Sequence, residues 1–215
     1  MRQVKKGNYK PIVTLIDLTG CHSSGHSLDL LIEVSSRNAE LIVDSTLPLL
    51  FSTLPDRAPA RDAHSERAKC WSTLNRLSRL CVSQPLFETL VIRLTTKLDL
   101  ACDTGLTGSS TEDLEVTSAY AHAILKTLAD TLEVKVSSKH SDIAKYMDRL
   151  LPRLFRLFIH LALHPAGVKI MNMRLLEIAG RVITLVVSCA SVEYGIPTTL
   201  TTADWANWLT DDRLH

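Results

Sequence analysis

A loop near the start of the chain gathers cysteine and histidine, the side chains that most often bind transition metals. The stretch GCHSSGHS, residues 20–27, brings Cys21, His22 and His26 close together. A structural zinc site needs four such ligands arranged as a tetrahedron, and no second cluster at conventional spacing supplies the remaining ones. We interpret this loop as an exposed polar segment and predict no metal site.

Two further histidines, His160 and His164, are four residues apart and would share one face of a helix that continued through both. An HExxH metalloprotease site also needs an acid between its histidines, whereas apolar residues stand between these two, so we interpret them as a helix-end pair. The sequence has no GxSxG nucleophile elbow. Gly105 and Gly108 do not precede the Lys-Ser or Lys-Thr pair of a phosphate-binding loop. The sequence therefore predicts a protein that is not an enzyme and that holds no cofactor.

The cysteines give no sign of a disulfide framework or of an iron–sulfur cluster. They are odd in number and widely separated, at Cys21, Cys70, Cys81, Cys102 and Cys189. Cluster motifs need closely spaced thiolates, and the chain has no CxxC pair. Reduced thiols in a cytosolic or nuclear compartment fit this pattern. Cys70, Cys81 and Cys102 fall on or beside apolar helix faces, and we expect them to be buried.

One charge pattern is a candidate binding site. Four cations are spaced four, four and three residues apart and form one stripe on the helix predicted at 141–162: Lys145, Arg149, Arg153 and Arg156. Such a stripe would receive an acidic loop of a partner protein or, less favourably, nucleic-acid phosphates. The alternative is a solvated face whose charge is balanced by acids of a neighbouring helix, such as Asp130 or Glu133.

The composition narrows the possible partners. The net charge is +1 with histidine neutral, so no global field is available to hold nucleic acid, and we predict no direct nucleic-acid partner. The most apolar stretch, 168–187, carries a charged residue every few positions, which a membrane-spanning helix tolerates only at high cost. The basic N-terminus lacks an apolar segment of secretory length. We expect a cytoplasmic and nuclear protein with no membrane partner.

Long amphipathic helices must position these residues. Apolar side chains recur at helical spacing through most of the chain. The pattern predicts a first helix that begins at Ser27 or Leu28. It predicts further helices at 38–53, 63–82, 85–102, 114–134, 141–162 and 168–190. We expect Pro48 to kink or divide the second helix, and we expect loops at 54–65 and 103–113. Ser110 and Asp113 form a helix-capping pair, and the turn at 164–167 stops a helix.

The order of the helices predicts a fold. Helical hairpins begin near residues 63, 114 and 168, an offset of roughly fifty, slightly above the ~40–47 of HEAT or armadillo repeats. We predict an all-α, HEAT-type α-solenoid of antiparallel hairpins over 28–191, with an N-terminal segment at 1–27. An irregular helical bundle is the alternative. A tail at 192–215 holds a short helix at 202–209 with Trp205 and Trp208, which would either cap the last hairpin or form an exposed recognition motif.

Several blocks of sequence resemble a known family in their order and spacing. They are LPLLFSTLPDRAP at 47–59, LFETLVIRLTTKLDL at 86–100, YAHAILKTLADTLEVK at 120–135, AKYMDRLLPRLFRLF at 144–158 and RVITLVV at 181–187. These blocks resemble the middle section of the large HEAT-repeat adaptor of the cytosolic iron–sulfur protein assembly targeting complex, a family first named for nucleotide-excision repair and transcription phenotypes. The filamentous-fungal form is the most similar, and the chain would be a central fragment of it.

The resemblance implies a function. Members of that family are non-enzymatic scaffolds that bind assembly factors and present apo-client proteins, among them helicases and polymerases of DNA repair, replication and transcription, for cluster insertion. A different α-solenoid scaffold, of the transport or phosphatase type, is the alternative, and a small helical enzyme or nucleic-acid binder is a third hypothesis. A segment of a longer solenoid would also expose apolar end faces, so we expect self-association through its ends.

Overall fold

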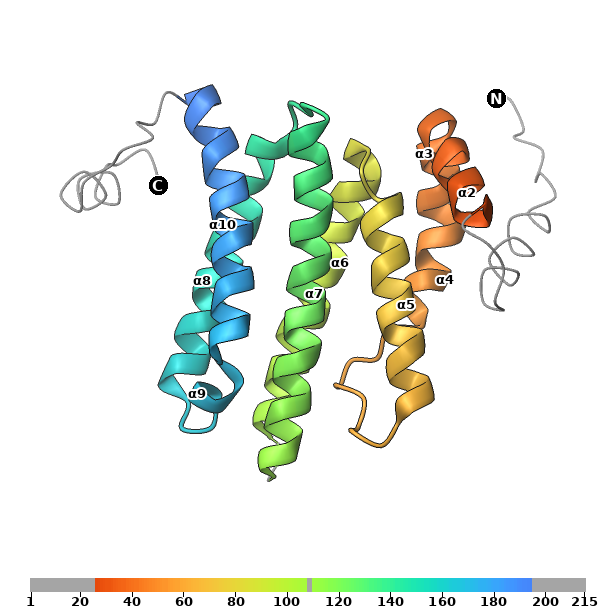
Figure 1. Cartoon of the computed structure of the whole chain (residues 1–215). Coiled ribbons are helices and arrows are strands. Elements are labelled where there is room, and N and C mark those ends of the chain that lie inside the picture. Colours follow the sequence, from red (N-terminus) through yellow and green to blue (C-terminus); the bar gives the residue numbers. More distant parts are fainter. Residues whose placement is uncertain (1–25, 108–109, 195–215) are drawn as a thin grey trace, which may run out of the picture.

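The structure is a computed structural model that describes residues 26–107 and 110–194 (Figure 1). All regular elements in these two ranges are helical. The Cys21–His22 loop and the short helix predicted at 202–209 lie outside the described residues. The division of the chain at residues 27 and 191 stays a prediction.

Most helices follow one another with short links, and a longer loop at 53–63 separates α4 from α5. In chain order they are α2 (His26–Arg37), α3 (Ala39–Leu41), the π-helical η1 (Ile42–Thr46), α4 (Leu47–Ser52), α5 (His64–Leu80), α6 (Gln84–Leu106), α7 (Thr111–Ser137), the 3-10 helix η2 (Ile143–Tyr146), α8 (Met147–Leu163), α9 (Gly167–Ile170) and α10 (Met173–Tyr194).

The helices form two layers. Helices α2, α5, α7 and α10 stand side by side in the first layer, and α4, α6 and α8 lie behind them in the second (Figure 1). Within the described residues, α2, α5 and α7 are each followed by a second-layer partner. The chain is therefore an α-solenoid of antiparallel hairpins, α2 with α3–α4, α5 with α6, and α7 with α8, while α10 begins a fourth. This arrangement confirms the predicted HEAT-type fold.

The apolar face of each helix is buried where the layers meet. The helical spacing placed a row of residues on the inner faces of α6 and α7, and all of them are buried: Leu86, Leu90, Leu94, Leu98, Tyr120, Ile124, Leu128 and Leu132. Leu150, Leu154 and Leu161 of α8 are buried in the same core. Cys70, Cys81 and Cys102 are buried as expected. Burial of apolar area on this scale is the main stabilising contribution.

Two helix boundaries were predicted correctly for physical reasons visible in the structure. The backbone N–H of Asp113 donates to Ser110 Oγ over 3.0 Å, so Ser110 caps α7. Pro48 lies in the first turn of α4, directly after η1. A proline in a continuous helix would clash with the carbonyl of the residue four positions earlier, and the π-helical turn divides the helix at this point.

Two other boundaries were predicted wrongly. The loop expected at 103–113 is shorter than predicted, because α6 continues to Leu106 and α7 begins at Thr111. The single helix expected over 168–190 is broken at Asn172, whose Oδ1 accepts a hydrogen bond from the backbone N–H of Leu175 over 3.0 Å and so begins α10. The Asn172 side chain also donates to Ser118 of α7 over 2.8 Å, which fixes the break against the first layer.

Candidate protein-interaction surface

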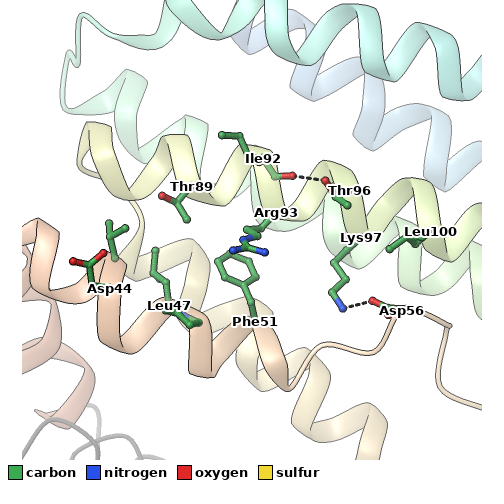
Figure 2. A pocket seen from close by; sticks show the side chains of 12 residues that line it. Asp44, Leu47, Phe51, Asp56, Thr89, Ile92, Arg93, Thr96, Lys97 and Leu100 are labelled. Carbon is green, nitrogen blue, oxygen red and sulfur yellow. Dashed lines mark hydrogen bonds and ion pairs between the residues drawn. The ribbon is translucent and has the colours of Figure 1, made fainter. Parts of the chain in front are cut away.

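Helix α6 occupies the middle of the second layer and has a groove on each side. The groove between α6 and the η1–α4 segment has a volume of about 700 Å³ (Figure 2). Its apolar lining comes from Leu47 and Phe51 on one wall and from Ile92 and Leu100 on the other. Because Ile92 and Leu100 are both exposed, the groove offers apolar contact area to a partner.

Charged groups stand along this groove. Lys97 forms an ion pair with Asp56 (Figure 2). It also donates to the backbone carbonyl of Leu54 over 2.7 Å, so its charge is already paired within the chain. Arg93 and Asp44 line the same groove and are exposed. Within residues 26–107 and 110–194, neither forms an ion pair. The groove therefore presents one guanidinium and one carboxylate beside its apolar walls.

The groove on the other side of α6 contains part of the predicted basic stripe. It has a volume of about 380 Å³ and is lined by Asp99 and Asp103 of α6 and by Arg153, Arg156 and His160 of α8. Burial raises the pKa of the Asp99 carboxyl, and the nearby Arg153 opposes that rise. The carboxyls and guanidiniums thus face one another across the groove.

The four stripe residues differ in whether they have a hydrogen-bond or ion-pair partner within the chain. Arg149 forms an ion pair with Glu88 of α6, and Arg153 donates to Thr95 Oγ1 over 2.7 Å. Lys145 and Arg156 are exposed and form no ion pair with any other described residue. The stripe therefore divides into Arg149 and Arg153, which bond to α6, and an exposed pair of cations, of which Arg156 also lines the groove that contains Asp99.

The acids expected to balance the stripe were misassigned. Asp130 and Glu133 belong to α7 in the first layer, where both pair with Arg181 of α10. Helix α8 lies beside α6 in the second layer, so the acids that balance the stripe come from α6. Lys145 belongs to η2, and the other three stripe residues belong to α8. Their spacing predicted which side of α8 they share but not which helix that side faces.

The two histidines of the predicted pair have different roles, because His160 belongs to α8 and His164 follows it. His160 Nε2 lies 3.4 Å from Asp103 Oδ1. His164 is the residue after the helix, and its Nδ1 accepts a hydrogen bond from the backbone N–H of Ala166 over 3.2 Å. This confirms the helix-end interpretation. No set of three potential ligands gathers into a metal site anywhere in the described part of the chain.

A buried cluster was missed by sequence reasoning. Lys135 has no exposed side-chain area and pairs with the buried Asp142. Phe87 lies with its ring centroid 5.0 Å from Lys135 Nζ, and Tyr146 packs edge-on against Phe87. The sequence did indicate that Lys135 is buried, because it lies seven residues after Leu128 and therefore on the same buried face of α7. Every polar group in the cluster is satisfied within the chain, so the cluster has a structural role.

The layered antiparallel hairpins define an all-α fold of the HEAT type, in which stacked repeats form an extended surface. The family model described as RNAPII transcription regulator C-terminal (MMS19 type) matches residues 73–195, more than half of the chain. The chain belongs to this family. The resemblance placed the chain in the middle section of a longer protein, whereas the family description refers to the C-terminal part.

Other comparisons add no further relative. No curated protein and no solved structure matches the chain. Among the described helices, none combines the length and the apolar character that crossing a membrane requires.

Proposed function

We propose that this chain is a non-enzymatic scaffold of cytosolic iron–sulfur protein assembly, working in the cytoplasm and nucleus. It would bind assembly factors and present apo-client proteins, such as helicases and polymerases of DNA repair, replication and transcription, for cluster insertion. Membership of the MMS19-type family supports this proposal most directly, because the match begins within α5 and extends to the end of α10. The same proposal involves no direct contact with nucleic acid and no cofactor held by the chain.

The second layer supplies the binding surface in this proposal. Its two grooves lie on either side of α6, and its exposed cations include Lys145 and Arg156 of the stripe and Arg93 of the groove beside α4. Exposed cations beside apolar walls fit a partner segment that carries both carboxylates and apolar side chains. Arg149 and Arg153 complete the stripe but are already engaged with α6.

A binding experiment with purified proteins tests the proposal. The full chain is immobilised and titrated with individual assembly factors of the targeting complex at low and high salt. Lys145→Glu with Arg156→Glu reverses the charge of the two exposed stripe residues that form no ion pair with a described residue. We expect roughly tenfold weaker binding at low salt. Lys169→Glu with Arg174→Glu makes the same charge change at exposed sites of α9 and α10 and serves as the matched control.

The outcomes separate the two parts of the proposal. Failure of the unmodified chain to bind any assembly factor would contradict the scaffold function itself. Binding that is equally strong in the stripe variant and in the control variant would contradict the assigned surface. Thermal unfolding of both variants checks that the fold is retained, which we expect because all four side chains are exposed.

A further inference from the structure

The last hairpin leaves an apolar face at one end of the stack. On α8, Phe155, Ile159 and Leu163 are 52%, 60% and 81% exposed, and on α10, Met173 is 70% exposed. Helices α8 and α10 form the end of the stack opposite α2 (Figure 1). Apolar groups gathered in this way mark a surface that something else covers.

Hydrogen bonds and ion pairs to the neighbouring helices show which way this face points. Arg153 and Arg149 hold α8 against α6, and Phe155 lies about 160° round the helix from Arg153 at 100° per residue. Arg181 holds α10 against the acids of α7, and Leu176 lies about 140° round from Arg181. The apolar sides of both helices therefore face away from the stack. This end face is defined by Phe155, Ile159, Leu163, Met173 and Leu176.

The order of the hairpins indicates which segment of the chain would cover the end face. After α5 the chain turns at 81–83 into α6, and after α7 it turns at 138–142 into η2 and α8. Each turn places a second-layer helix beside the previous second-layer helix. Helix α10 begins a fourth hairpin, so the next helix in the chain would lie against α8, on the end face.

The residues that follow α10 suit this position. The sequence predicts a helix at 202–209, and the link 195–201 falls within the 2–8 residues usual for antiparallel neighbours. Its apolar residues Trp205, Trp208 and Leu209 have i, i+3, i+4 spacing and line one side. A helix over the eight residues 202–209 is about 12 Å long, close to the ~13.5 Å of the nine-residue stretch of α8 from Leu151 to Ile159. So short a helix is unstable alone in water and needs a packing surface.

We propose that residues 202–209 bind the end face through Trp205 and Trp208 as the second-layer helix of the fourth hairpin. The proposal is independent of the partners suggested above, because it concerns an intramolecular contact. It also gives the exposed apolar residues of α8 and α10 a single explanation, since two indole rings bury large apolar areas against such a surface.

Tryptophan fluorescence of the full chain tests this contact. Trp71 is the only other tryptophan, and the Trp71→Phe variant leaves Trp205 and Trp208 as the sole reporters. We expect these two to emit at short wavelength and to resist acrylamide quenching. Adding Phe155→Glu and Ile159→Glu would shift the emission to longer wavelength and raise quenching to the level seen in concentrated guanidinium. The matched control adds Leu30→Glu and Val134→Glu, two exposed apolar residues elsewhere, and would leave the emission unchanged.

Dilution and light scattering distinguish the possible occupants. Protection that persists on dilution, in a protein that stays monomeric, supports the intramolecular contact. Protection that is lost on dilution as a dimer dissociates would show that a second copy covers the face, and the proposal would be wrong. Fully quenchable tryptophans in the Trp71→Phe protein, or protection that survives the two glutamates on α8, would also overturn it. Circular dichroism of each variant confirms that the stack is folded.

Discussion

Lys135 and Asp142 form an ion pair inside the protein, with Lys135 Nζ 2.8 and 2.7 Å from the two carboxylate oxygens of Asp142. The same ammonium donates to the backbone carbonyl of Val82 over 2.9 Å. Tyr146 Oη lies 3.2 Å from Asp142 Oδ2. The pair therefore joins the end of α7 to the turn between α5 and α6 and to the start of the α8 segment, so that two hairpins share one set of polar contacts.

Asp142→Asn is expected to destabilise the protein by about 3–5 kcal/mol, because it leaves a buried ammonium without its counter-charge. Burial lowers the pKa of Lys135, and Asp142 opposes that change. Urea unfolding measures the loss. Lys135→Met with Asp142→Asn removes both charges and should recover part of the stability. A single Asp142→Asn variant as stable as the unmodified protein would show that the pair contributes little.

The buried thiols should make stability fall at high pH. Burial raises the pKa of Cys70 to about 11 and of Cys102 to about 12, from an ordinary value of 9.0. Above pH 9 the unfolded chain releases these protons while the folded chain keeps them. The contribution of the thiols to the free energy of unfolding is therefore fully present below pH 9. It is lost as the pH rises, at up to about 1.4 kcal/mol per pH unit for each thiol. Urea unfolding between pH 8 and 10.5 measures the slope.

A single substitution isolates one thiol's share of that pH dependence. Cys102→Ala removes one titrating group, and the slope of stability against pH should fall by the contribution of one proton even though the absolute stability also changes. An unchanged slope would mean that the Cys102 thiol ionises equally in the folded and unfolded states.

Gly105 permits close packing of α6 against α7. A Cβ atom at this position would lie 2.5 Å from Thr117 Cγ2 and Oγ1, and Thr117 is buried. Gly105→Ala should therefore destabilise the protein by about 1–3 kcal/mol, although alanine is otherwise the better helix former. Thr117→Ala removes two of the three clashing atoms, so the double variant should lose less stability than the sum of the two single variants. Strict additivity in that cycle would exclude a clash.

Tyr120 attaches the loop at 53–63 to the core. Its side chain is fully buried, and its hydroxyl donates to the backbone carbonyl of Pro55 over 2.8 Å. Tyr120→Phe removes the donor and should cost about 1–3 kcal/mol. Thr96→Ala is the control, because the exposed Thr96 hydroxyl bonds only to its own helix, and it should change stability by less than about 0.5 kcal/mol. Urea unfolding compares them, and equal values for the two variants would contradict the assigned role of the hydroxyl.

The helical period allowed prediction of the core but not of every helix end. The spacing of Leu86, Leu90, Leu94 and Leu98 identified the buried face of α6, because a helix repeats its faces at that interval whatever its neighbours. The end of α6 depends on a neighbour: Gly105 is helical where α6 lies close to Thr117. Contacts between segments far apart in sequence leave no local pattern to read.

For the stripe, too, the local spacing predicted the side of the helix, whereas the acids that balance its charge depend on the tertiary structure. Spacing placed Arg149 and Arg153 on one side of α8, as observed. The acids that balance them, Glu88 and Asp99, lie about sixty and fifty residues earlier in the chain, a separation set by the two-layer arrangement. Lys135 was overlooked for a different reason. A charged residue on an apolar face is usually solvated, and its burial depends on Asp142 beyond the end of its helix.

Helix α7 packs against helices of the second hairpin on one side and against α9 and α10 on the other, whereas α2 has α5 as its one neighbour among the described helices of the first layer. Opening of a hairpin stack proceeds from its least supported members. Amide hydrogens of α2 should therefore exchange with solvent through small local openings. Those at the centre of α7 should exchange only when the whole protein unfolds, so that exchange rates fall along the stack toward its middle helix.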